Sequence, residues 1–155
     1  MYDVDDICDY VIARLRAAGV HINLLKLHKL LYYVQAWALA YDNEPMFDED
    51  FQAWVHGPVS RRIFDRFKES KSLYSSVGVQ DIREGFDAGS LREATVNNIN
   101  SVLDVYGGFS GDQLEQLTHE EQPWLEARAN LSPTERSTEV ISQETMGSFY
   151  RARLS

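Results

Sequence analysis

KLHKLLYYVQAWALAYDNEPMFDEDFQAWVHGPVSRRIFDRFK, residues 26–68, contains the strongest structural signals of this chain. Between Leu30 and Tyr41 apolar residues follow one another almost without interruption, so the second half of the helix that they indicate has no face left for solvent. A helix that is apolar all round lies at the centre of a protein. The core residues that we predict on this helix are Leu30, Leu31, Tyr33 and Trp37.

This central helix is too short, and too polar at its ends, to span a membrane. A span needs about 20 predominantly apolar residues. The run here is shorter, contains Gln35 and is bracketed by Lys29 and Asp42. We therefore expect a helix buried in a protein core, and no membrane partner.

The second half of the stretch indicates a short strand followed by an amphipathic helix. Residues 51–55 alternate apolar and polar side chains, and the alternation breaks at a Gly-Pro pair. A proline in the first turn of a helix lacks only an N–H that would be unpaired there, so we predict that Pro58 opens the next helix. Arg61, Arg62 and Arg66 lie on the polar face of that helix. Charge reversal at Arg62 or Arg66 should then change the stability of the fold by no more than about 0.5 kcal/mol.

The flanking sequence predicts further helices. One begins near Val4 and stops at Gly19. Residues 70–88 have no clear periodicity, and we expect a long loop there with short strands around 77–79 and 81–86. Capping residues or a proline mark the starts of the later helices, at Ser90, Ser110, Pro123 and Ser142.

Composition fits one folded domain. The 155 residues are 44% hydrophobic and 12% aromatic, enough to bury a core without metal or disulfide staples. We predict a single compact domain over residues 1–155, mainly α, built around the central apolar helix with a minor short-strand element. Cys8 is the one cysteine, and no charged-then-apolar leader begins the sequence, so we expect a cytoplasmic location.

The charge balance bears on the partners. A formal net charge of −9 repels a phosphate backbone on average, so nucleic acid is not expected as the primary partner. An acidic surface of this kind either keeps the protein soluble or faces a basic partner, and the sequence leaves both readings open.

Two histidines are the best candidates for chemistry. His56 and His119, with Glu120 and Glu121, have the residue types of a metal site or an acid–base pair. Their spacing matches no HExxH or paired-cysteine site, and the chain has no phosphate-binding glycine loop or nucleophile elbow. We therefore predict no catalytic residue, no metal and no cofactor, and a structural or partner-contact role for both histidines.

Four short pieces of sequence follow one another in a fixed order. They are Tyr32-Tyr33 with Gln35-Ala36-Trp37, Pro45-Met46-Phe47, Ala53-Trp54 with Gly57-Pro58-Val59, and Leu117-Thr118-His119 with Pro123-Trp124. In this order they resemble the Panacea domain family, which includes SocA-like antitoxins and phage-associated genetic-element proteins. Met46 and His28 are small departures, at positions where the family often has leucine and glutamine.

The resemblance implies an antitoxin of a type II toxin–antitoxin pair that neutralises a cognate protein toxin by direct binding. The alternative is an adaptor that delivers its partner to a cytosolic protease, and a small metal-dependent hydrolase is a third reading. The sequence does not identify the toxin.

We place partner binding at the Gly-Pro turn, on the arginines that follow it and on the segment from His119 to Trp124. Proline-fixed turns and helix starts are ordered before binding, so binding through them loses little conformational entropy. Trp54 and Trp124 are open to either a core or a contact role, and we include Trp54 among the core residues. The predicted contact residues are His56, Gly57, Pro58, Arg61, Arg62, Arg66, His119, Glu120 and Trp124.

Overall fold

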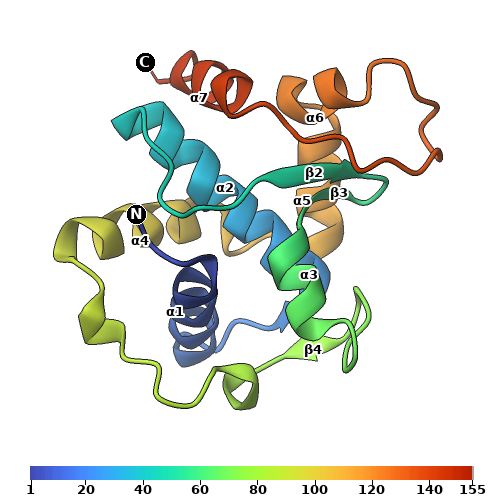
Figure 1. Ribbon diagram of the computed structural model, residues 1–155. Coiled ribbons are helices and arrows are strands. Elements are labelled where there is room, and N and C mark those ends of the chain that lie inside the picture. Colours follow the sequence, from blue (N-terminus) through green and yellow to red (C-terminus); the bar gives the residue numbers. More distant parts are fainter. Residues whose placement is uncertain (155) are drawn as a thin grey trace.

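A computed structural model describes residues 1–154, which form seven α-helices and two small antiparallel sheets (Figure 1). The predicted fold class, mainly α, is confirmed. Helix α2 (Leu24–Asp42) runs through the middle of the molecule. Asn23 begins it by accepting a hydrogen bond from the Lys26 amide, and Asn43 ends it in the left-handed conformation, at φ 58°. From Leu24 to Ala40, every residue except Trp37 is buried.

The other elements pack around α2. Helix α7 follows its second half, whereas α1, α4, α5 and strand β3 contact it from other sides (Figure 1). Within residues 1–154 none of the helices has both the length and the apolar character to cross a membrane. The helices are α1 (Val4–Ala17), α3 (Arg61–Phe67), α4 (Glu93–Tyr106), α5 (Gly111–His119), α6 (Gln122–Ala127) and α7 (Gln143–Arg151). The strands are β1 (Ile22–Asn23), β2 (Phe51–Trp54), β3 (Gly57–Ser60) and β4 (Ser76–Val77), with the 3-10 turns η1 (Val79–Asp81) and η2 (Ala88–Ser90).

The Gly-Pro pair does not open a helix as predicted. Strands β2 and β3 form a tight antiparallel hairpin in which Pro58 lies opposite Ala53. Helix α3 begins at Arg61, three residues later, and Ser60 caps it by accepting from the Ile63 amide at 3.2 Å. A proline fits here because β3 is the edge of the ribbon, where one missing N–H disturbs no ladder bond.

The predicted core residues differ in how deeply they are buried. Leu30, Leu31 and Tyr33 are fully buried, whereas Trp37 and Trp54 are only partly buried. Trp37 packs against the core with one edge and donates its indole N–H to the Tyr106 hydroxyl at 3.0 Å. Trp37 also lines a groove between α2 and α4.

The loop after α3 is attached to the rest of the molecule mainly by ion pairs, and only one short strand forms in it. A short strand forms at 76–77 and pairs with β1, but residues 81–86 form no strand. Instead, Arg83 reaches α1, where it donates to Asp9 Oδ2 at 2.7 Å and to Asp6 Oδ1 at 2.6 Å. Ser90 does not cap α4 as predicted, because it lies in η2 and the helix begins after Arg92.

Candidate functional site

The hairpin turn is anchored on α2 by one buried lysine. Lys29 Nζ donates a hydrogen bond to the Pro58 carbonyl at 2.9 Å, and the Lys29 side chain is fully buried. Gly57 has φ +102°, and a Cβ placed there would lie 2.6 Å from Lys29 Cε and 3.0 Å from Thr118 Oγ1. Burial lowers the pKa of Lys29 to about 7. The Gly-Pro pair is therefore tied to the core on one side.

The second predicted contact segment, from His119 to Trp124, packs against the hairpin. The His119 ring stacks on the indole of Trp124, with centroids 4.0 Å apart and planes tilted by 16°. Trp124 is buried, and its indole N–H donates to the Trp54 carbonyl at 2.9 Å. Burial also lowers the pKa of His119, which favours the neutral ring. The structure therefore brings the hairpin and the His119–Trp124 segment together.

Sequence reasoning missed the carboxylate that reaches the exposed histidine. His56, at the tip of the hairpin, has its Nδ1 atom 3.1 Å from Glu115 Oε1. Glu120, which we had grouped with the histidines, is exposed at the end of α5. Glu115 stands four residues before His119, a spacing that places two side chains on one helix face and was the signal available in the sequence. Among the residues that the structure describes, no three His, Cys, Asp or Glu side chains converge as metal ligands.

The three arginines of α3 differ, which corrects the prediction of a uniformly solvated strip. Arg61 is 52% exposed and pairs only with Asp65 on its own helix. Arg62 is 55% exposed but contacts Asp5 on α1 and Asp3, the N-cap of that helix.

Arg66 is a structural residue. Its side chain is 14% exposed and contacts Asp5 and the fully buried Asp9. It also donates to the Asp81 carbonyl at 2.9 Å. These contacts tie α3 to α1 and to the following loop. Arg66 is therefore not available to a partner in the way that we predicted.

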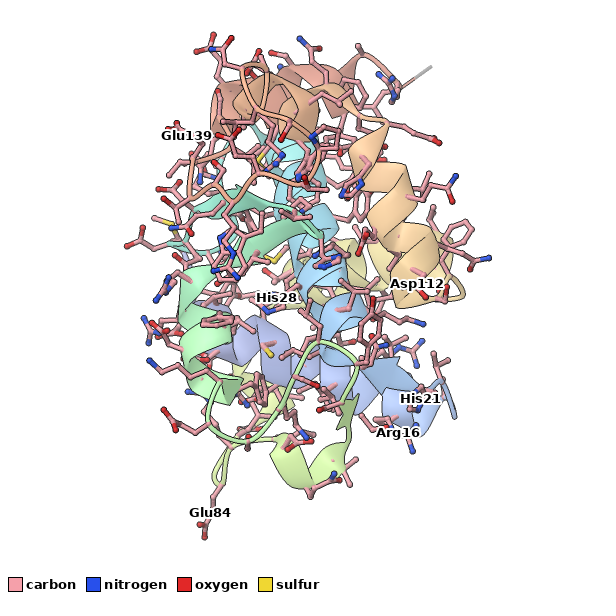
Figure 2. All side chains as sticks on the ribbon, turned by 90° about the vertical axis from the view of Figure 1, so that its right-hand side faces the viewer. Arg16, His21, His28, Glu84, Asp112 and Glu139 are labelled. Carbon is pink, nitrogen blue, oxygen red and sulfur yellow. The ribbon has the colours of Figure 1, made fainter. Side chains whose placement is uncertain are left out.

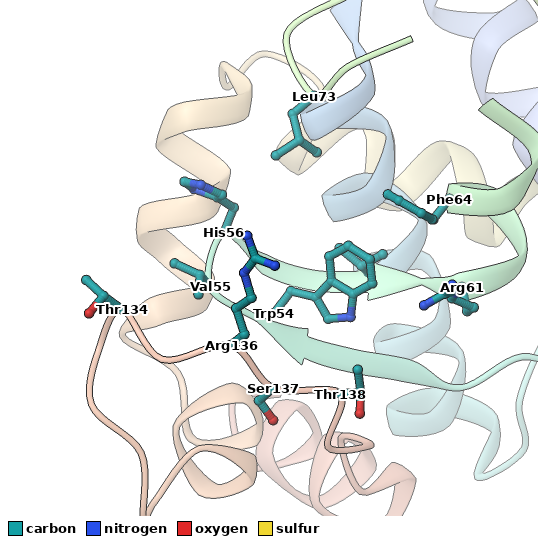
Figure 3. A pocket seen from close by; sticks show the side chains of 11 residues that line it. Trp54, Val55, His56, Arg61, Phe64, Leu73, Thr134, Arg136, Ser137 and Thr138 are labelled. Atoms are coloured by element: carbon teal, nitrogen blue, oxygen red, sulfur yellow. The ribbon is translucent and has the colours of Figure 1, made fainter. Parts of the chain in front are cut away.

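An open groove of about 760 Å³ lies beside the hairpin (Figure 3). Trp54 and Phe64 form its floor, with ring centroids 4.9 Å apart in an edge-to-face arrangement. Arg61 from α3 and Arg136 from the loop before α7 flank the Trp54 indole on opposite sides. His56 closes one end. Of the predicted contact residues, only His56 and Arg61 line this groove.

A family model described as antitoxin SocA-like, Panacea domain, matches residues 27–125. The chain belongs to this family. No curated protein and no solved structure matches the chain. The Panacea match spans most of α2, the hairpin, α3, α4, α5 and most of α6, and so includes both partners of the Lys29–Pro58 bond.

The Panacea match accounts for one side of the groove but not for the other. Trp54, His56, Arg61 and Phe64 lie within the matched residues. The opposite wall, formed by residues 134 and 136–138, follows the match and belongs to the loop before α7. In this chain the groove is therefore assembled from residues within the match and a segment that follows it.

Proposed function

We propose that this Panacea domain protein is the antitoxin of a type II toxin–antitoxin pair and neutralises a cognate protein toxin by direct binding in the cytoplasm. The observation that carries the proposal is the match to SocA-like antitoxins over residues 27–125. The role is binding and not catalysis.

The hairpin face fits a protein-binding role. Aromatic residues and arginine are enriched where protein interfaces concentrate their binding energy, and Trp54, Phe64 and Arg61 meet in one open groove. The face is also ordered before binding, because Lys29 holds the turn and Trp124 holds the Trp54 carbonyl. A preordered surface loses less conformational entropy when a partner binds.

The test is rescue of growth. The chain is co-expressed with each small protein encoded next to it, and growth and complex formation by the purified pair are measured. Rescue together with a stable complex is the expected result. If no neighbouring gene is toxic, or if rescue occurs without any complex, the antitoxin proposal fails.

The same rescue in a host lacking its main cytosolic proteases separates occlusion from delivery. Direct neutralisation predicts equal rescue in both hosts, because the toxin is blocked by contact alone. Loss of rescue in the protease-deficient host would favour the adaptor reading.

A further inference from the structure

We propose that the groove between the β2–β3 hairpin, α3 and the loop before α7 binds an acidic peptide segment of the partner, with one large apolar side chain seated on Trp54 and Phe64. This inference rests on the proposed function, since it names the chemistry of the segment that the antitoxin would hold. The volume of the groove, about 760 Å³, lies within the range of sites that enclose a ligand of several side chains.

The floor of the groove presents hydrocarbon to whatever binds there. The indole N–H of Trp54 is already satisfied by Gln52 Oε1 at 2.8 Å, so the ring has no polar atom left to offer. Phe64 stands edge-to-face against it. Both side chains are only partly buried in the free protein. An apolar side chain placed on them would remove this remaining aromatic surface from water.

The rim of the groove has the opposite charge to the rest of the chain. The sequence has 24 acidic and 15 basic residues, yet no Asp or Glu lines the groove. The cationic residues there are Arg61 and Arg136, with His56 at one end. Arg61 pairs with Asp65, and the exposed His56 pairs with the half-buried Glu115. Ion pairs that remain open to solvent are weak. Arg136 forms no ion pair or side-chain hydrogen bond with any residue from 1 to 154.

Carboxylates on both sides of an apolar residue match this layout. Figure 3 shows Arg136 and Arg61 on opposite sides of the Trp54 indole. A guanidinium can accept a carboxylate through two parallel N–H bonds, which gives orientation as well as attraction. An acidic segment would therefore be held at two points around its apolar anchor.

The backbone edges of the ribbon exclude a simpler mode, the addition of a strand. β2 already has neighbours on both sides, because the Ala53 amide donates to Glu139 and the Ile141 amide to Phe51, each at 2.8 Å. On the edge strand β3, Pro58 has no N–H and its carbonyl is bound to Lys29. The occupant is thus recognised through its side chains.

A peptide fits better than a nucleic acid. A nucleic acid needs several phosphate contacts along its length, and its affinity depends on how many phosphates the protein neutralises. Here two arginines and one histidine stand on a chain of net charge −9. Such a site can neutralise a few carboxylates, but the remaining surface repels a long polyanion.

The direct test uses the purified full chain and a fluorescein-labelled peptide with one phenylalanine between two glutamates on each side. Fluorescence anisotropy at low ionic strength should show saturable binding. Arg61→Glu and Arg136→Glu should each weaken it by about tenfold or more, because reversal replaces attraction by repulsion. Arg153→Glu is the matched control, since Arg153 is also exposed but follows α7 and does not line the groove. Its affinity should equal that of the wild type.

Three further probes can overturn the inference. A peptide with lysines in place of the glutamates, or with glycine in place of the phenylalanine, should bind at least about tenfold more weakly. Equal binding of either peptide would contradict the charge or the apolar part of the proposal. A single-stranded oligothymidine that binds more tightly than the acidic peptide, and is weakened by the same two reversals, would assign the groove to nucleic acid.

The toxin assay distinguishes failure of this inference from failure of the proposed function. If the two folded reversal variants neutralise and bind the toxin as the wild type does, the groove is not the toxin site, although the chain remains an antitoxin. If the wild type binds the acidic peptide but neutralises no neighbouring toxin, the groove inference stands on the peptide data and the antitoxin proposal fails.

Discussion

Lys29 Nζ and the Pro58 carbonyl are joined by a 2.9 Å hydrogen bond, and both residues are buried. The stem of the same lysine fills the space beside Gly57. A single side chain on the central helix therefore sets both the position and the residue type of the hairpin turn. The conformation of the hairpin, and with it the place of Trp54 and His56, depends on this contact.

Gly57→Ala should destabilise the fold by about 2–5 kcal/mol. The substitution combines strain at positive φ, about 1–2 kcal/mol, with overpacking against Lys29, about 1–3 kcal/mol. Gly85→Ala is the matched control, because Gly85 has φ +83° but no atom within 4 Å of an added Cβ. Gly85→Ala should lose only the stability that backbone strain at positive φ costs, about 1–2 kcal/mol. Urea unfolding of both variants is the measurement, and equal losses would show that the Lys29 contact is unimportant.

The contribution of Lys29 to stability should increase with pH between about 7 and 10. The pKa of Lys29 is about 7 in the folded chain, against 10.5 for an exposed lysine. Between these values the unfolded chain binds more protons than the folded one, so the free energy of unfolding rises with pH. Below about pH 7 the lysine is protonated in both states and this slope disappears.

Lys29→Met should flatten that rise. The test is the free energy of unfolding of wild type and variant across the same pH range. Lys68→Met is the control, because it removes the same charge from a side chain that is 46% exposed. A variant curve parallel to the wild type would mean that Lys29 does not titrate in this window.

His28→Leu should stabilise the protein, and increasingly so as the pH falls. His28 is fully buried, and neither ring nitrogen has a hydrogen-bond partner within residues 1–154. Burial, with the neighbouring Lys29, holds its pKa well below 6.5. Below about pH 6.5 the unfolded histidine takes up a proton and the folded one does not, so the wild type loses stability as pH falls.

At neutral pH the gain should be about 1–3 kcal/mol, the usual penalty for an unsatisfied buried polar group. His21→Leu is the control, because His21 is exposed whereas His28 lies inside the molecule (Figure 2). Melting temperatures from about pH 7 to pH 5 supply the comparison. Equal pH dependence of wild type and His28→Leu would show that His28 does not cause the loss of stability at low pH.

Arg66→Met should lower stability by about 1.5–3 kcal/mol, because it removes a charged hydrogen bond from the buried Asp9, whose other oxygen stays bound to Arg83. Arg61→Met should stay within about 0.5 kcal/mol, since Arg61 is exposed and pairs only within its helix. Chemical denaturation of the two variants checks both values. Similar, small losses would restore the idea of a uniformly solvated arginine face.

The features that could be predicted from the sequence are local ones. The central helix, the strand at β2 and the Ser110 capping box follow from neighbouring residues, because the helix period and capping bonds span only a few positions. The family resemblance, now confirmed by the match to residues 27–125, rests on the same short pieces. The error at Pro58 arose because a proline suits both a helix start and an edge strand.

The features of the candidate site depend on pairs of residues far apart in the chain. Arg66 meets Asp9 across 57 positions, and His56 meets Glu115 across 59. A periodic pattern says which face of an element is polar, but not which opposite charge will face it after folding. For this reason the sequence alone is sufficient for a mainly α Panacea domain with a buried central helix. The packing of distant segments makes Arg66 a structural residue and leaves Arg61 accessible. It also places Arg136 beside Trp54.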